Sequence, residues 1–568
     1  TFCDIEWEMV YKDVAGIYAL TLKKEGMSIL PFKNDTEPAQ NKATKQISTF
    51  RIDFEGLESR IEALPVPAGN YRDLALDDTS LFYLNSDDGD YNKMDYRELG
   101  PRTLYRYYFN NHEVKTVIEN INGFKISSDG SNIVYSKGKQ LGIISSNSEN
   151  SNGNDLNLSD LKMKIDPVLE WKAIFNEAWR MERDFYYEAN MHGIDWNSMK
   201  EKYGKLIDMA TCRQDIGFII GELIGELNTS HTYVYGGSGQ RNPNKLNIGM
   251  LGADWAPDMT TKSYQFKKIY RVPDWSREVY SPLAKPGLNI IDGDYLLAVN
   301  GEKVTTDKNI YSYFIDLAGK QVKLLVNNIA SETGAREVIV EPLRSEAQLR
   351  YNDWIEHNRI EVEKASNGQI GYIYMPDTYE GSATDFPKYF YSQTKKKGLI
   401  VDARFNGGGL DPEIFFQRLL KKPHGYWTRR YSEDQTIPFL AVTAHMVCLT
   451  NRYAGSGGDE LPYEFKLNKM GPVIGTRTWG GLVGISMFLE LLDGSGLTAP
   501  DYRIYNENGD WVVENEGVEP DIVIEQNSLD LSKGKDTQLM KAVEVLMVKI
   551  KEEPRSMPMH KPYPVDKK

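Results

Sequence analysis

One serine is notable for the small residues around it. The run TNRYAGSGGDE, residues 450–460, places Ser456 between glycines. A serine in such surroundings usually belongs to a loop that turns the chain. Its hydroxyl becomes a nucleophile only when a base lies within hydrogen-bond reach, another group orients that base, and donors can bind the oxyanion. Whether Ser456 can attack a substrate therefore depends on what distant segments contribute.

Histidine is the natural base for such a serine, and His231 is the best placed of the seven in the chain. It lies in the run TSHTY, where small polar residues end a predicted helix and let an imidazole project into a cleft. A single loop histidine is more often an ordinary surface residue. His445 precedes a predicted strand, and His357 and His424 lie in charged surroundings. No histidine pair has the spacing of a zinc site, and we expect no metal and no other cofactor.

Two further segments offer the remaining groups. The run RFNGGG puts Gly407, Gly408 and Gly409 directly after an apolar stretch, where three glycines let backbone N–H groups converge on one point. A plain turn between a strand and a helix would need only one glycine. The run WVVENEGVEPDI offers Glu514 and Glu516 as the acid that orients the base, although either could be an ordinary carboxylate at the end of a strand.

Size and composition restrict the class of protein. At 568 residues the chain is long enough for about four domains. The net charge of −14 argues against a nucleic acid as the main partner. No apolar run approaches the ~18 residues of a membrane span. Three scattered cysteines, Cys3, Cys212 and Cys448, predict neither a disulfide framework nor a metal site.

The first residues, TFCDIEWEMV, lack both an initiator methionine and the pattern of a signal peptide. We therefore expect that something upstream was removed or is not included. The cytoplasm is the default location, and a periplasmic or exported protein is the alternative if a signal peptide preceded residue 1.

Residues 1–150 predict short strands separated by turns. The run YRDLALDDTSLFYL begins at Tyr71, and the similar GFKISSDGSNIVYS begins at Gly123. A strand, an Asp-containing turn and another strand, repeated after about 50 residues, are typical of propeller blades. Roughly two or three blades fit in this length, and a propeller needs at least about four to close. We therefore expect the C-terminal part of a β-propeller, with an ordinary β-sandwich as the alternative.

A polar linker is followed by apolar residues at helical spacing, which predict a small helical domain over residues 160–240 that carries His231. The predicted apolar positions are Val168, Trp171, Phe175, Ala178, Ile216, Ile219, Ile220, Leu223 and Leu227. Residues 241–345 predict strands, with Asn300-Gly301 as a hairpin turn between apolar runs.

Residues 346–555 predict an α/β layered domain that carries Ser456. Apolar strands are expected at 369–376 and 398–409, and a helix at 411–422. The strand MVCLT leads toward Ser456. The tail, residues 556–568, is predicted to be disordered.

The run LAKPGLNIIDGDYLLAVNGEKV resembles a PDZ domain, in which Gly-Asp, two leucines and Val-Asn-Gly come in this order. The run NIGMLGADW, residues 247–255, stands where that family has its loop for a peptide carboxylate. The 241–345 segment is therefore expected to be PDZ-like.

A wider resemblance joins these motifs. TSHTY, the PDZ-like segment, VDARFNGGG, NRYAGSGGDE, GTRTWGGLVG and VENEGVEPDI come in the order found in the tricorn branch of the tail-specific protease superfamily, serine peptidase family S41. The resemblance covers residues 165–525. The blade-like segment extends it to the N-terminus, because that branch carries two β-propellers before its catalytic half. It implies a multidomain fold with partial propeller blades, a helical domain, a PDZ-like domain and an α/β catalytic domain.

The resemblance also assigns roles to residues of this chain. Ser456 is the implied nucleophile and His231 the implied general base, with Ser230 and Glu514 completing a tetrad. The N–H groups of Gly409 and Gly457 are the implied oxyanion donors. Glu514 is preferred to Glu516 because it matches the acid of the family motif.

Two departures from related patterns affect the expected chemistry. The processing proteases of the same superfamily use a serine and a lysine, and Gly481 stands where that lysine would be, which favours a histidine mechanism. The tricorn branch has an aspartate after Gly-Tyr that reaches a neighbouring subunit's S1 pocket, whereas GYWTRR has Trp427. Since Trp427 cannot pair with a buried cation, a hydrophobic or aromatic P1 residue is expected and a basic one disfavoured. Gly457 replaces an acidic residue of the pattern but retains its backbone N–H.

The leading hypothesis is a serine peptidase that cleaves peptides through an acyl-enzyme, within a homo-oligomer that is a hexamer by resemblance. Peptides are the expected partners, and neither a nucleic acid nor a membrane span is expected. The first alternative is a non-catalytic scaffold that binds peptides through its PDZ-like and propeller parts. The second is an esterase or amidase acting on non-peptide substrates.

Overall fold

The computed structural model describes residues 13, 15–26, 28–30, 50–86, 102–237, 246–271, 280–410 and 412–565. Cys3, the first residue of the helix expected at 411–422, and the last three residues of the predicted tail lie outside the described residues. The chain forms two compact units, Thr1–Ile165 and Asp166–Lys568. Among the described ranges, none of the helices combines the length and the apolarity that a bilayer crossing requires.

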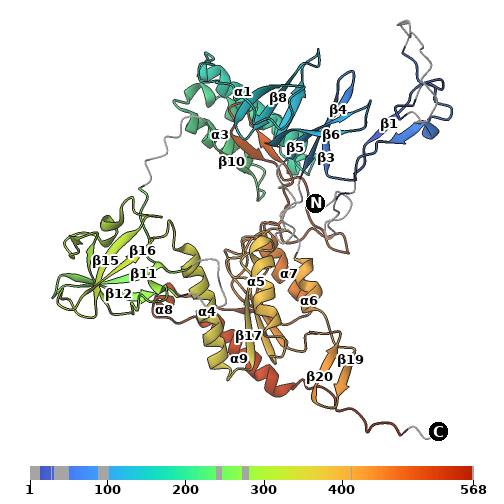
Figure 1. The fold of residues 1–568 in the computed structure, drawn as a ribbon. Coiled ribbons are helices and arrows are strands. Elements are labelled where there is room, and N and C mark those ends of the chain that lie inside the picture. Colours follow the sequence, from blue (N-terminus) through green and yellow to red (C-terminus); the bar gives the residue numbers. More distant parts are fainter. Residues whose placement is uncertain are drawn as a thin grey trace. The chain divides into compact units, whose positions relative to one another are not determined.

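The first unit is built from antiparallel sheets (Figure 1). A four-stranded sheet has the order β3-β4-β5-β6, a second has the order β7-β8-β9, and β1 pairs with β2. The strands are β1 (Tyr18–Leu20), β2 (Ile61–Ala63), β3 (Tyr71–Leu76), β4 (Ser80–Ser86), β5 (Arg102–Tyr108), β6 (Val114–Ile121), β7 (Gly123–Ile126), β8 (Asn132–Lys137) and β9 (Gln140–Ser145). The two similar sequence runs thus form equivalent hairpins, β3–β4 and β7–β8. Sheets of this kind are what propeller blades are made of, and the propeller itself stays a prediction.

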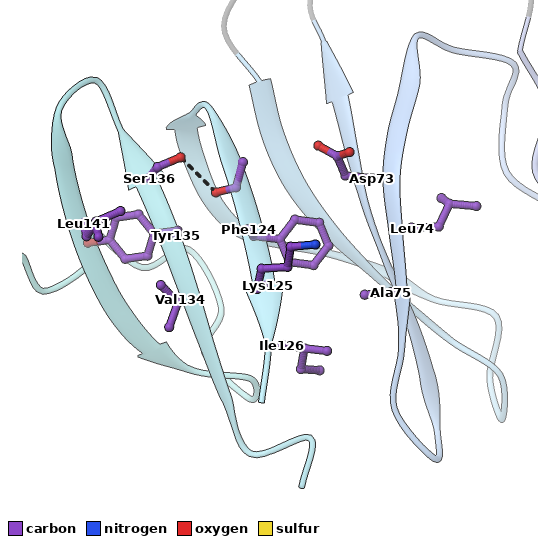
Figure 2. A pocket seen from close by; sticks show the side chains of 11 residues that line it. Asp73, Leu74, Ala75, Phe124, Lys125, Ile126, Val134, Tyr135, Ser136 and Leu141 are labelled. Carbon is purple, nitrogen blue, oxygen red and sulfur yellow. Dashed lines mark hydrogen bonds between the residues drawn. The ribbon is translucent and has the colours of Figure 1, made fainter. Parts of the chain in front are cut away.

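A cavity of about 530 Å³ lies where the two larger sheets of this unit face each other. Figure 2 shows its lining, which comes from β3 on one side and from β7, β8 and β9 on the other. Ser136 donates a long hydrogen bond of 3.5 Å to the carbonyl of Gly123, which links β8 to β7 across the cavity wall.

The second unit begins with three helices, α1 (Pro167–Phe185), α2 (Trp196–Gly204) and α3 (Arg213–Gly225). Asp166 caps α1 by accepting hydrogen bonds from the N–H groups of Val168 and Leu169. The predicted apolar face of α3 is confirmed, because Ile216, Ile219, Ile220, Leu223 and Leu227 are all buried. The prediction for the start of α1 was wrong at Val168, which is 42% exposed because the first turn of α1 extends beyond the helical core.

The next domain is a single antiparallel sheet with the order β11-β12-β13-β15-β16, and β14 pairs with β13. Its strands are β11 (Ala253–Asp258), β12 (Ser263–Ile269), β13 (Tyr295–Val299), β14 (Glu302–Lys303), β15 (Val322–Asn327) and β16 (Arg336–Val340). The predicted hairpin at Asn300-Gly301 is confirmed. Both residues have positive φ, 49° and 85°, as the tight turn between β13 and β14 requires.

The largest core belongs to a parallel sheet with the order β17-β18-β21-β22-β25. These strands are β17 (Ile370–Tyr374), β18 (Gly398–Asp402), β21 (His445–Thr450), β22 (Val473–Gly475) and β25 (Ile522–Val523). Every residue of β17 and β18 is buried, as in parallel strands covered on both faces. The predicted α/β layered domain is therefore confirmed.

Helices cover this sheet, and α4 and α9 pack against each other as well as against its strands (Figure 1). The helices are α4 (Ala347–Ala365), α5 (Glu380–Tyr391), α6 (Glu413–Leu419), α7 (Gly457–Leu467), α8 (Ser528–Ser532) and α9 (Thr537–Glu552). The helix expected at 411–422 is thus shorter than predicted, and β18 ends at Asp402, so the glycine run lies beyond the strand.

Two small sheets complete the unit. A hairpin is formed by β19 (Gly425–Arg429) and β20 (Ser432–Ile437). The other sheet has the order β10-β24-β23, with β10 (Tyr233–Tyr235), β24 (Gly496–Thr498) and β23 (Phe488–Glu490). Because β10 follows the three helices and β24 lies in the segment between β22 and β25, this pairing ties the turn of His231 to the domain of the parallel sheet.

Candidate active site

The site is built at the carboxyl ends of two adjacent strands. β18 and β21 are parallel neighbours in register, with Asp402 opposite Leu449. The glycine run follows the end of β18, and the loop to Ser456 follows the end of β21. The N–H of Gly455 donates to the carbonyl of Asn406, 3.1 Å away, which joins the two loops. This is the edge at which parallel α/β sheets bind ligands.

Ser456 sits at the start of α7 in a strained backbone conformation, with φ 57° and ψ −123°. Its N–H donates to the carbonyl of Gly481 at 3.0 Å and to the carboxylate of Asp459 at 2.9 Å. The side chain is half-buried. A sharp turn from strand to helix that holds a serine in this way presents its hydroxyl to a substrate.

The glycine run packs directly against Ser456. Gly408 has φ 80°, and a Cβ on it would lie 2.5 Å from the Cβ of Ser456. Gly409 has φ 147° and bridges Thr378. Among the hydrogen bonds of the described residues, neither the N–H of Gly409 nor that of Gly457 has an acceptor. Both groups are therefore available to an oxygen atom of a substrate.

His231 lies in the turn between α3 and β10 and also has a positive φ of 58°. The hydroxyl of Thr498 donates to its carbonyl at 2.8 Å, so β24 holds the turn in place. The imidazole meets the ring of Trp479 edge to face, with 5.6 Å between centroids. The ring of Trp479 also packs on Gly455, which precedes Ser456, and on Gly481, whose carbonyl accepts from the Ser456 N–H.

The surroundings of the imidazole favour its neutral form. Burial lowers the pKa of His231, and the negative charge of Glu514 and the backbone of Gly481 oppose that shift only in part. Nδ1 lies 3.2 Å from the hydroxyl of Tyr233. Nε2 is buried and has no hydrogen-bond partner among the described residues. A buried, unpartnered imidazole nitrogen can accept a proton from a substrate or from a nucleophile.

Glu514 is buried and accepts four hydrogen bonds. The Ser230 N–H and hydroxyl donate at 2.8 and 2.9 Å, and the N–H groups of Leu482 and Val483 donate at 2.7 and 3.1 Å. The residues before and after Glu514, Val513 and Asn515, both have positive φ, so the carboxylate is presented by a strained turn. Glu516, the other acid considered from the sequence, has an exposed side chain.

Some expected contacts are missing from this arrangement. Ser230 reaches Glu514, yet the described hydrogen bonds do not join Ser230 to His231, whose Nδ1 faces Tyr233 instead.

Trp427 is 56% exposed on the β19–β20 hairpin. Its neighbour Tyr426 lines a cavity with the residues that precede β18 and β21. The base of the hairpin therefore lies at the edge of the sheet opposite Ser456, and this chain does not bring Trp427 to its own serine.

Three contributors were not predicted from the sequence. Trp479 walls the imidazole, Tyr233 contacts its Nδ1, and Asp459 holds the turn at Gly480 and Gly481 by accepting their N–H groups at 2.8 and 3.1 Å. Burial raises the pKa of Asp459 despite these donors. A sequence signal existed for Asp459, since an acid three residues after a serine at a helix start is a capping pattern. No local signal marked the two aromatic residues.

Three family models match the second unit. The tricorn protease C1 domain matches residues 167–225, the tricorn protease PDZ domain residues 249–345, and peptidase family S41 residues 369–524. Residues 369–524 thus belong to peptidase family S41, and the two preceding matches are to domains of the tricorn protease. The matches to the tricorn C1 and PDZ models lie on the helices α1–α3 and on the β11–β16 sheet, and the S41 match contains both Ser456 and Glu514.

Named tricorn proteins align with most of this chain. It is 32% identical over 540 residues to the putative Tricorn-like protease C-terminal subunit of Sulfurisphaera tokodaii, covering 92% of this chain and 61% of that protein. It is 30% identical to the Tricorn protease of Thermoplasma volcanium, covering 94% of this chain and 51% of that protein. A crystal structure of the tricorn protease superposes with a TM-score of 0.78 at 28% identity, covering 90% of this chain and 49% of that chain. The chain thus spans about half to three-fifths of the length of these relatives.

Proposed function

We propose that this chain is the catalytic part of a tricorn-like serine peptidase. Ser456 attacks the peptide carbonyl while Nε2 of His231 takes the hydroxyl proton. The C–N bond then breaks, the imidazolium gives this proton to the leaving amine, and water hydrolyses the acyl-enzyme with His231 again as the base. The N–H groups of Gly409 and Gly457 receive the oxyanion. Ser230 and Glu514 complete the tetrad by fixing the segment that carries the base.

The observation that carries this proposal is the state of His231. Its Nε2 is buried without a partner among the described residues, and its pKa is lowered, so the imidazole is neutral and ready to accept a proton at neutral pH. If His231 served only in packing, this buried nitrogen without a hydrogen bond would lower the stability of the fold and contribute nothing to function. The negative charge of Glu514 acts in the opposite direction and favours the imidazolium that forms during attack.

The position of Glu514 supports the proposed role of His231 as the general base. It lies 284 residues from Ser230 in the sequence and binds both its backbone and its hydroxyl. The segment Ser230–His231 is therefore anchored to the domain that carries Ser456. Catalytic hydrogen bonds are often long without substrate and tighten when substrate binds, so His231 and Ser456 are expected to align on binding.

A fluorophosphonate label tests the proposal without knowledge of the substrate. We expect covalent labelling of Ser456, and its loss in Ser456→Ala and in His231→Ala. His357→Ala, which changes an exposed histidine on α4, is the matched control and should label like the wild type. A wild-type chain that stays unlabelled while it still binds peptides would support the scaffold function instead. Cleavage of a peptide library then separates a peptidase from an esterase or amidase.

The S1 pocket is proposed to involve Trp427 of another copy of the chain. The hairpin that bears Trp427 lies at the sheet edge opposite Ser456, so its exposed indole is available only to a neighbouring subunit's site. A homo-oligomer, such as a hexamer, is therefore part of the proposal, and sedimentation of the catalytically active species tests it.

In matched peptides, kcat/KM should favour P1 Leu or Phe over Arg. Trp427→Asp should move the preference toward Arg by about tenfold, the equivalent of one charge-assisted contact of ~1.5 kcal/mol.

The sheets of the first unit are proposed to be blades of a β-propeller that belongs to the peptidase. The equivalent hairpins β3–β4 and β7–β8 support this assignment. Peptides, probed as labelled substrates of increasing length, are the proposed partners of the whole protein.

A further inference from the structure

A cavity of about 730 Å³ opens at the amino-terminal edge of the parallel sheet. It is lined by the segments that lead into β18, β21 and β22, which are adjacent strands. The end of α6, the start of β19 and the chain after α9 complete the wall. Since β21 runs from this edge to the loop of Ser456, the cavity lies about 20 Å from the candidate active site.

The lining is strongly basic in a protein whose net charge is −14. No aspartate or glutamate belongs to it among the residues that the structure describes. Its basic members are Lys395, Lys396, Lys397, Lys422, Lys469 and Arg555. Concentrated charge of one sign in a concave site attracts ions of the opposite sign.

Carboxylates outside the cavity neutralise only part of this charge. Lys395 pairs with Glu433 at 2.8 Å, but both side chains are more than four-fifths exposed, so the pair is weak. Lys396 pairs with Glu363 at 3.2 Å. Within the described ranges no ion pair involves any of the other four cations, and Arg555 donates only to backbone carbonyls.

Part of the cavity wall is apolar. Leu420, Val442, Met446 and Met470 contribute to it, together with the hydrocarbon stems of the lysines. The volume falls within the range of pockets that bind small ligands, whose walls are mostly apolar with a few polar groups that fix orientation. A bare inorganic anion would leave the apolar wall uncovered, and a neutral hydrocarbon would leave the cations without a partner.

We propose that this cavity binds a small anionic amphiphile, a carboxylate attached to an apolar chain. The carboxylate lies among the lysines and is received by Lys422 and Lys469, which have no ion pair with a described residue. The apolar chain covers the wall formed by Leu420, Val442 and the two methionines. Because this site uses none of the residues of the proposed peptidase, it is independent of whether Ser456 is a nucleophile.

Calorimetric titration with decanoate tests the proposal. We expect decanoate to bind at least tenfold more tightly than decanol, decyltrimethylammonium or inorganic phosphate, and added salt to weaken its binding. N-acetyl-leucyl-leucine, compared with its C-terminal amide, identifies the source of the carboxylate. Tighter binding of this peptide than of decanoate indicates a peptide C-terminus as the natural ligand, and the reverse indicates a fatty acid.

Lys422→Gln combined with Lys469→Gln should weaken decanoate at least tenfold. Both lysines are exposed, so the fold should be retained, as circular dichroism and thermal unfolding would verify. Lys303→Gln with Lys320→Gln, two exposed lysines of the β11–β16 domain, is the matched control and should bind decanoate like the wild type. Equal affinity for decanol, unchanged binding in the Lys422 and Lys469 variant, or no binding of decanoate would overturn the proposal.

Discussion

Replacing Glu514 by glutamine tests how the catalytic loop is held. The substitution keeps the shape of the side chain and removes its charge. Oε2 accepts from the hydroxyl of Ser230 and from the N–H groups of Leu482 and Val483, and Oε1 accepts from the Ser230 N–H. A glutamine can place its amide oxygen at the first position and keep three donors. Its amide nitrogen then faces the N–H of Ser230, donor against donor.

The cost follows from these four bonds. A hydrogen bond to a charged group is about twice as strong as a neutral one, and a neutral one contributes about 1 kcal/mol. Making three bonds neutral therefore removes about 3 kcal/mol, and the unsatisfied Ser230 N–H adds ~1–3 kcal/mol. If about 3 kcal/mol of this total is lost in the transition state, the rate falls by roughly two powers of ten.

The assay is the second-order rate of fluorophosphonate labelling, followed by kcat on a fluorogenic peptide. Glu516→Gln is the matched control, because it makes the same change at an exposed carboxylate two residues away and should label at the wild-type rate. A Glu514→Gln variant that labels within a factor of about three of the wild type, less than 1 kcal/mol, would refute the reasoning. An equal loss in both variants would show that the charge, and not the bonds to Ser230, is what matters.

The labelling rate should fall toward acid as the pH drops through the pKa of His231, with a midpoint below the ordinary histidine value of 6.5, because only the neutral imidazole accepts a proton. A rate that rises toward acid would contradict this. Burial raises the pKa of Glu182 from 4.5 to about 8, so its folded form keeps a proton that the unfolded chain loses, and stability should fall as pH rises between these values. Glu182→Gln should remove that slope and raise the free energy of unfolding at pH 7 by about 3 kcal/mol, measured by urea unfolding at pH 5, 7 and 8.5; an unchanged slope would show that Glu182 is ionised in the fold. Gly408→Ala should abolish labelling, because residue 408 has a positive φ and the added Cβ would clash with Ser456. Gly407→Ala is the control and should label normally, because its Cβ would meet nothing nearer than 3.9 Å. Equal labelling of the two variants would mean that the loop shifts to accommodate the added Cβ.

Much of the architecture follows from local patterns. The apolar face of α3, the turn at Asn300-Gly301 and the buried strands β17 and β18 are all encoded within short stretches, because helix and strand periodicity and turn conformation depend on neighbouring residues. The order of the motifs around Ser456 and His231 was also sufficient to indicate the peptidase family.

Tertiary packing decided what those residues can do. From the sequence, Glu514 and Glu516 were equivalent candidates except for a motif match, and only the fold buries Glu514 against Ser230, 284 residues away. The exposure of Val168 and the edge-to-face contact of Trp479 with His231 likewise depend on which elements meet. The basic cavity is assembled from five separate segments, none of which is unusual alone. Burial, unpaired donors and shifted pKa values arise from contacts between segments far apart in the chain, and short-range sequence patterns carry no record of those contacts.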